Sequence, residues 1–174
     1  MGARDDALTY PEVGATGSEV LPAGYRHVRR SEPLGTGEVV FAAVAAGMRR
    51  WDLHRRAGLR LRPDSATPQV GADFSAGLPL LVVTMWVPCR VVWVRDDRSS
   101  YGYGYGYGTR RGHPESGEEA FTVSMAGDGT VWFTLRAFSR PASRLARLGG
   151  PVTAWLQDHL TDRYVDAARR LVPR

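Results

Sequence analysis

Residues 101–108 read Tyr-Gly-Tyr-Gly-Tyr-Gly-Tyr-Gly, and residues 109–119 continue as Thr-Arg-Arg-Gly-His-Pro-Glu-Ser-Gly-Glu-Glu. Side chains alternate between the two faces of an extended chain, so a strand formed by the repeat has four tyrosines on one face and bare glycine backbone on the other. Because glycine gives a strand nothing to pack, a glycine face marks a place where something approaches the backbone. A helix across the sheet, a ligand in a cavity, or a disordered low-complexity tract would each account for the repeat.

Strand and turn patterns on both sides favour an ordered strand over a disordered tract. Residues 90–95 are rich in β-branched and aromatic side chains and lead into a polar turn at residues 96–100. Residues 120–125 and 130–138 predict two more strands, and the Ala-Gly-Asp-Gly between them is a strong hairpin signal. The repeat is therefore interpreted as a central strand, although the sequence leaves open which of its faces points inward.

Two amphipathic helices accompany these strands. Residues 37–56 have apolar side chains three and four apart, with Thr36 as the expected N-cap and Gly58 as the end. Residues 151–171 repeat the pattern after a Gly-Gly-Pro break that separates them from a shorter expected helix, because proline suits the first turn of a helix. Four further strands are predicted at residues 25–32, 59–62, 70–74 and 80–87, with Pro88 interrupting the last.

This order of elements predicts an α+β fold, in which a curved antiparallel β-sheet packs against a long C-terminal helix in the manner of helix-grip domains. The chain has 174 residues, which suits one compact domain with a substantial core. We expect residues 25–174 to form that domain. Residues 1–24 contain glycine and proline without sustained periodicity, so they are expected to be a flexible, loosely attached entry segment.

Composition excludes several classes of protein. No apolar run approaches 18 residues, and the first ten residues lack the apolar centre of a secretory signal, so no membrane association and a cytoplasmic location are expected. All 23 basic residues are arginine, and they occur in scattered pairs that indicate a solvated surface and argue against nucleic-acid binding despite the formal charge of +5. Cys89 is the single cysteine, so an internal disulfide and a thiolate metal cluster are excluded. No phosphate-binding loop is present, and no cofactor or metal is expected.

One cluster of ionisable side chains is the best candidate for chemistry. Imidazole beside carboxylates can serve as a general acid–base pair or bind a hard divalent metal, although this spacing fits no standard metal loop. The structural alternative is a polar turn between two strands, whose carboxylates face Arg110 and Arg111. The candidate catalytic residues are His113, Glu115, Glu118 and Glu119.

Aromatic side chains suggest a cavity, because rigid rings with polar tips commonly line small-molecule pockets, although a core would use them equally well. The candidate ligand-binding residues are Trp93, Tyr105, Tyr107, Thr109, Trp155 and His159. If the tyrosines point inward their hydroxyls need partners, which His159 or Glu118 could provide. His54 lies beside two arginines at the end of a predicted helix, where we expect a cation that complements the helix dipole.

The segment Gly112–Phe121, preceded by Tyr107-Gly108-Thr109, resembles the characteristic motif of the bacterial and plant family DUF1990, also called UPF0548. The resemblance spans residues 20–172, and the upstream half of the Tyr-Gly repeat departs from it. Further matches are Tyr25-Arg26-His27, Trp51, Val70-Gly71 and Arg163-Tyr164. This family has no established activity, so the resemblance implies a fold rather than a reaction.

The order of elements also resembles that of the START-like and Bet v 1-like proteins, which hold apolar or aromatic ligands between sheet and helix and in some cases catalyse cyclisation or hydrolysis. We therefore expect a protein that binds a small apolar or aromatic molecule. One alternative is a hydrolase or cyclase-like enzyme that uses His113 or a glutamate as base. Another is a structural or interaction module, including a homo-oligomer, in which the Tyr-Gly strand adds to another sheet by edge pairing.

Overall fold

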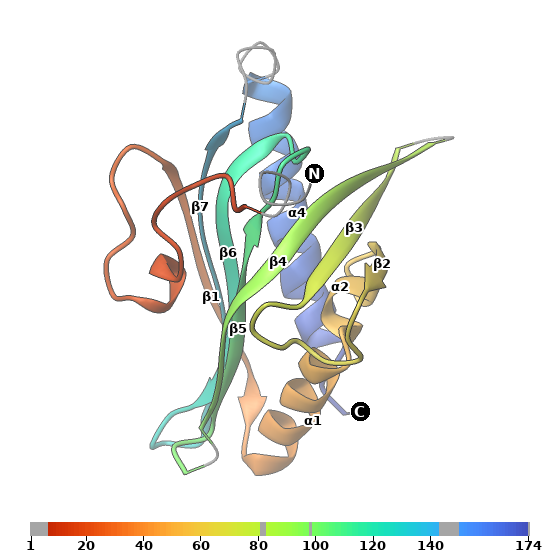
Figure 1. Cartoon of the computed structure of the whole chain (residues 1–174). Coiled ribbons are helices and arrows are strands. Elements are labelled where there is room, and N and C mark those ends of the chain that lie inside the picture. Colours follow the sequence, from red (N-terminus) through yellow and green to blue (C-terminus); the bar gives the residue numbers. More distant parts are fainter. Residues whose placement is uncertain (1–6, 81–82, 98, 143–149, 174) are drawn as a thin grey trace.

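A curved antiparallel sheet grips a long C-terminal helix in the computed structural model, which describes residues 7–80, 83–97, 99–142 and 150–173 (Figure 1). The seven strands of the described part have the order β1-β7-β6-β5-β4-β3-β2. They are β1 (Arg26–Thr36), β2 (Arg60–Pro63), β3 (Asp73–Leu80), β4 (Val83–Asp97), β5 (Gly102–Thr109), β6 (Glu115–Met125) and β7 (Thr130–Pro141). The helical elements are the short 3-10 helix η1 (Ala15–Gly17), α1 (Glu38–Arg49), α2 (Asp52–Arg56) and α4 (Gly150–Arg169). The predicted α+β helix-grip fold is confirmed.

The Tyr-Gly repeat forms β5 in the interior of this sheet. It pairs with β4 on one side and with β6 on the other, so it has no free edge. The hypothesis that this strand adds to another sheet by edge pairing is therefore wrong. Tyr103, Tyr105 and Tyr107 point inward and are buried among the core residues, which answers the question of orientation. Tyr101 lies in the turn before β5, and its ring packs on Phe41 with the centroids 5.7 Å apart.

The predicted strand boundaries around Pro88 are wrong. β4 continues through this proline, which pairs with Ser75 of β3, because β5 has already ended at the pair Cys89 and Thr109. The amide that proline lacks therefore has no ladder partner to lose, while its carbonyl accepts a hydrogen bond from the Arg110 amide at 3.0 Å. The apolar run 80–87 is predicted to be one strand, but β3 ends at Leu80 and β4 begins at Val83 within it. The sequence between these two strands contains no glycine or proline that would indicate a turn.

The predicted helix 37–56 is divided into α1 and α2 by Trp51, whose backbone is left-handed with φ of 62°. A left-handed conformation is costly for a bulky residue, so it needs compensation from tertiary contacts. The indole is buried against Phe74 at 5.0 Å and Tyr105 at 5.6 Å between ring centroids, and it donates to the Ser65 carbonyl at 3.2 Å. Packing thus overrides the helical periodicity. The residue that precedes α1 is Gly37 rather than the expected Thr36.

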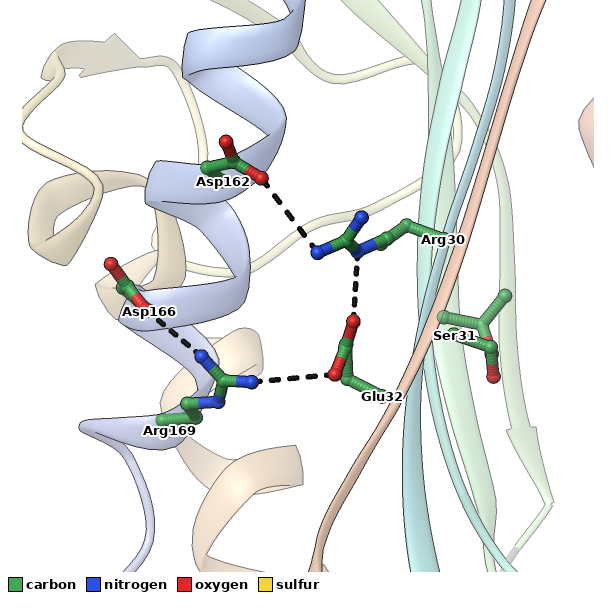
Figure 2. Close-up of polar contacts among 7 residues, drawn as sticks. Arg30, Ser31, Glu32, Asp162, Asp166 and Arg169 are labelled. Carbon is green, nitrogen blue, oxygen red and sulfur yellow. Dashed lines mark hydrogen bonds and ion pairs between the residues drawn. The ribbon is translucent and has the colours of Figure 1, made fainter.

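Charged side chains join α4 to the edge strand β1 (Figure 2). The Arg30 guanidinium lies 2.8 Å from the Glu32 carboxylate and 3.8 Å from that of Asp162 on the helix. Arg169 of α4 reaches back to Glu32 at 3.3 Å and also pairs with Asp166 at 3.2 Å. Because most of these groups are solvent-exposed, each pair contributes little by itself, and the network links the helix to β1.

Candidate functional site

The glycine face of β5 is covered by the N-terminal part of the chain. A Cβ atom on Gly106 would overlap the indole nitrogen of Trp93 and lie 2.9 Å from the Thr16 hydroxyl oxygen, and one on Gly108 would overlap the Tyr10 hydroxyl. The described part of the C-terminal helix packs on the other face of the sheet. Residues 8–21, which we call the N-terminal strap, therefore account for Gly108 and, together with Trp93 of β4, for Gly106, whereas a Cβ atom on Gly104 would overlap Thr122 of β6.

Glu118 holds the N-terminal strap in place. Its carboxylate accepts hydrogen bonds from the Tyr10 hydroxyl at 2.7 Å and the Gly14 amide at 2.7 Å. It also accepts from the Thr16 amide at 2.9 Å and from the Thr16 hydroxyl. Tyr10 and Leu21 of the strap are buried together with Phe138. The expectation of a loosely attached segment is thus wrong for residues 8–21, because distant residues that local sequence does not reveal hold them down.

On the opposite, concave face a pocket of about 170 Å³ lies between the sheet and α4. Most of its wall is apolar. The lining residues come from six strands, from the loops that precede β2 and β6, and from the helix; the apolar ones include Val28, Leu59, Ala76, Leu78, Met85, Val87, Cys89, Tyr107, Ala137, Leu160 and Tyr164. A cavity of about 150 Å³ in another protein binds benzene, so this pocket has room for one aromatic ring.

Glu119 supplies a carboxyl group to this apolar wall. Residue 119 pairs with Tyr107 of β5, and the Tyr107 hydroxyl donates a hydrogen bond to the Glu119 carboxylate. Burial raises the pKa of Glu119 to about 7, while the hydrogen bond from Tyr107 acts in the opposite direction. Burial also raises the pKa of Tyr164, a third pocket residue, well above its usual value. The pocket therefore combines a carboxyl that titrates near neutral pH with two neutral phenols.

His113 and Glu115 also line this pocket. The His113 Nδ1 atom accepts a hydrogen bond from the Glu115 amide at 3.0 Å, and burial lowers the pKa of the imidazole to about 4. Burial raises the pKa of the Glu115 carboxyl, which is opposed by a hydrogen bond with Ser139. The imidazole is therefore neutral at pH 7 and is used to shape the turn before β6.

The predicted polar turn and its charge pairing need correction. β6 begins at Glu115, so the last five residues of the motif are strand and not turn. Strand alternation sends Glu118 to the strap and Glu119 to the pocket, because residue 118 pairs with Gly108 and residue 119 with Tyr107. Arg110, expected opposite these carboxylates, instead pairs with Asp73 at 2.6 Å.

The candidate ligand-binding residues are divided between the two faces. Tyr107 and Thr109 line the pocket. Tyr105 is fully buried in the adjoining core, with its hydroxyl 3.3 Å from His54 Nδ1. Trp93 is on the strap side, where its indole donates to the Thr16 hydroxyl at 2.9 Å.

The two candidates on α4 are His159 and Trp155. His159 is solvent-exposed, and the neighbouring Leu160 lines the pocket in its place. The side chain of Trp155 lies outside the described residues, as does the shorter helix expected before residue 149. Tyr164 lines the pocket although it is not among the candidate ligand-binding residues; its place in the apolar stripe of the predicted helix was the available signal.

His54 is not the helix-end cation that the sequence suggested. Its side chain is fully buried, and burial together with the charge of Arg55 lowers the pKa to about 3, so the ring is neutral. It packs against Tyr105, Phe121 and Tyr164 at 5.3–6.0 Å between ring centroids. A short second helix, invisible in the apolar periodicity, turns this imidazole into the core.

Comparison with known proteins identifies the family. The model of a domain of unknown function, DUF1990, matches residues 9–167. The chain belongs to the DUF1990 family. A UPF0548 protein of Arabidopsis thaliana is 34% identical over 118 residues, which cover 63% of this chain and 56% of that protein. A UPF0548 protein of Deinococcus radiodurans is 28% identical over 180 residues, which cover 98% of this chain and 88% of that protein.

Solved structures share the fold of this DUF1990 protein at low sequence identity. A hypothetical protein of Helicobacter pylori superposes with a TM-score of 0.68 at 10% identity, covering 96% of each chain. The major latex-like protein 151 of Panax ginseng has a TM-score of 0.52 at 11% identity and covers 86% of this chain and 99% of its own. These likenesses establish the helix-grip architecture alone. Within the described residues, no helix has both the length and the apolar character needed to cross a membrane.

Proposed function

We propose that this DUF1990 protein binds a small, largely apolar molecule with one aromatic ring in the pocket between the sheet and α4. The observation that carries the proposal is the composition of that pocket. Its wall is built from aliphatic and aromatic side chains, and one carboxyl and two phenol groups converge within it. Ligand sites commonly combine a mostly apolar wall with a few polar groups that orient the ligand.

The size of the pocket limits the ligand. About 170 Å³ is well below the volume of sites for drug-sized molecules, which begin near 300 Å³. Leu78 and Met85 of the β3–β4 hairpin and Leu160 of α4 border the space, so movement of the hairpin against the helix would admit a larger molecule.

Native mass spectrometry of the purified protein tests the proposal directly, because a bound molecule adds its mass. Toluene titrated into the protein should in addition shift NMR signals of Ala137 and Tyr164 and raise the melting temperature. Ala137→Phe fills the pocket and should abolish both effects. Ala42→Phe on the exposed side of α1 is the matched control and should leave both intact. Absence of any added mass and of any toluene response in the wild type would overturn the proposal.

A second candidate function, a hydrolase or cyclase-like activity, is favoured by the pKa of Glu119. A carboxyl with a pKa of about 7 can accept and return protons at neutral pH, and it lies in the pocket wall where a substrate would bind. His113 is less suited as the base, because its pKa of about 4 leaves it weakly basic. If the protein is an enzyme of this kind, Glu119→Gln should abolish turnover while toluene binding persists.

A further inference from the structure

We propose that the natural ligand of the pocket is a small arylalkyl amine, in which one aromatic ring carries an aliphatic amino group, bound as its ammonium ion by the Glu119 carboxylate. This inference rests on the proposed function and specifies the chemical class of the ligand. It starts from the distribution of charge around the pocket.

The pocket is acidic although the protein is basic. The chain has a formal charge of +5, yet no arginine is among the described residues that line the pocket. Apart from the tyrosines and Cys89, the ionisable residues of the lining are Glu115, Glu118, Glu119 and His113. The Glu118 carboxylate is bound to the N-terminal strap on the other face of the sheet, and His113 is neutral at pH 7. An apolar ligand alone would need no such lining, and an anionic ligand would be repelled by it.

Two of the three glutamates are already compensated. Glu118 accepts hydrogen bonds from the strap, as described above. Glu115 is hydrogen-bonded to Ser139 and feels the charge of Arg26. Glu119 differs, because the Tyr107 hydroxyl is its one hydrogen-bond donor within the described structure, and no described cation pairs with it. A carboxylate has room for about four hydrogen bonds, so Glu119 has unused accepting capacity.

The groups that face Glu119 are neutral. Tyr107 and Tyr105 approach from β5, Cys89 from β4 and Tyr164 from α4, and burial raises the pKa of each of these groups. They supply no positive charge to balance an ionised carboxylate in an apolar pocket. An ammonium group supplies both the charge and three N–H donors.

The remaining walls suit the rest of such a ligand. The rings of Tyr107 and Tyr164 border the pocket and attract a cation through their faces. A single aromatic ring fills the apolar part, since the volume is close to that of a benzene site. Benzylamine combines one ring with a primary aliphatic amine, whose pKa lies above 8, so it is mostly charged at both pH 6 and pH 8.

Titration of Glu119 gives the proposal a direct readout. With a pKa of about 7, roughly a tenth of the carboxyl is ionised at pH 6 and roughly nine tenths at pH 8. Because the ammonium needs the ionised form, the affinity for benzylamine should rise about tenfold between these pH values. A ligand that accepts a hydrogen bond from the protonated carboxyl, such as benzaldehyde, would show the opposite trend.

The experiment measures dissociation constants of benzylamine, benzyl alcohol and benzoate at pH 6 and pH 8 by NMR titration. In the wild type, benzylamine should bind tightest at pH 8, with the tenfold pH dependence. Glu119→Gln should remove that dependence and weaken benzylamine at pH 8 at least tenfold, while benzyl alcohol is affected little. Glu19→Gln, on an exposed residue of the strap, should behave as the wild type.

The outcomes separate the two proposals. If benzyl alcohol binds but benzylamine binds no tighter at pH 8 and shows no pH dependence, the amine proposal is wrong while the pocket stands. If none of the three probes binds the wild type, the amine proposal falls, and the toluene titration decides whether the pocket proposal falls with it. The pH dependence in the wild type requires no substitution, so the test remains decisive even if Glu119→Gln folds poorly.

Discussion

Replacing Glu118 with alanine should free the N-terminal strap and destabilise the protein by about 3–5 kcal/mol. The change removes the acceptor of four hydrogen bonds, which come from Tyr10, Gly14 and Thr16. A hydrogen bond to a charged acceptor is worth about 1.5–3 kcal/mol, so full loss in a rigid structure would exceed this range. The cost stays lower because the strap can lift off the sheet and expose its donors to water.

Two measurements check this prediction. Urea denaturation gives the free energy of unfolding, and hydrogen exchange reports on the amides of Gly14 and Thr16, which donate directly to the carboxylate. Both amides should exchange much faster in Glu118→Ala, while those of β5 remain protected. Glu19→Ala is the control on the same segment. A loss below about 1 kcal/mol with unchanged exchange would refute the structural role of Glu118.

Three further predictions concern other parts of the molecule. Gly106→Ala should lower the free energy of unfolding by about 1–3 kcal/mol, because the new Cβ atom would overlap Trp93. Gly127→Ala is the control, because a Cβ atom there has nothing within 4 Å. Equal stabilities of the two variants in urea would contradict this prediction. The pKa of Glu119 is about 7 in the folded state and 4.5 ordinarily. Between these pH values the folded state binds more protons than the unfolded state, so the free energy of unfolding contributed by Glu119 falls by about 3 kcal/mol as the pH rises from 4.5 to 7. The free energy of unfolding of Glu119→Gln should therefore fall by about 3 kcal/mol less than that of the wild type between pH 4.5 and pH 8. Parallel plots of unfolding free energy against pH for the two proteins would contradict the raised pKa of Glu119. Arg30→Ala should lower stability by under about 1 kcal/mol and by less in 1 M salt, since the network it joins is exposed; a salt-independent loss would show that packing dominates.

Local patterns sufficed to predict the architecture but not the division of the motif between two faces. The hairpin at residues 126–129, the strand at the Tyr-Gly repeat and the final helix follow from periodicity and turn residues, and all three are present. The fate of adjacent Glu118 and Glu119 depends on strand parity. If residues 115–119 are treated as a strand paired with the Tyr-Gly repeat, residue 119 lies opposite a tyrosine and residue 118 opposite a glycine. The prediction of a turn over these residues hid this relation.

Other features lie beyond any local pattern. The N-terminal strap contacts β5 and β6 about 100 residues further along the chain, and its own sequence contains no strand or helix period that announces the contact. Trp51 adopts a left-handed backbone because of its packing partners, which tertiary structure alone brings together. The left-handed backbone at Trp51 also begins the short helix α2 that carries His54 into the core. The tertiary packing of Trp51 therefore accounts for both the break in the predicted helix and the burial of His54.

Four identical dipeptides at the centre of the sheet also bear on how the chain folds. A shift of β5 by two residues keeps every tyrosine inside and every glycine outside, so hydrophobic patterning does not distinguish the native pairing from a slipped one. Alignment must come from positions outside the repeat. Thr109 provides one, because its hydroxyl oxygen accepts from the Gly117 amide at 3.0 Å, and the irregularity of β4 between Val91 and Trp93 provides another. The native register of β5 is therefore set by residues at its Thr109 end and by its partner strand β4, and not by the repeat itself.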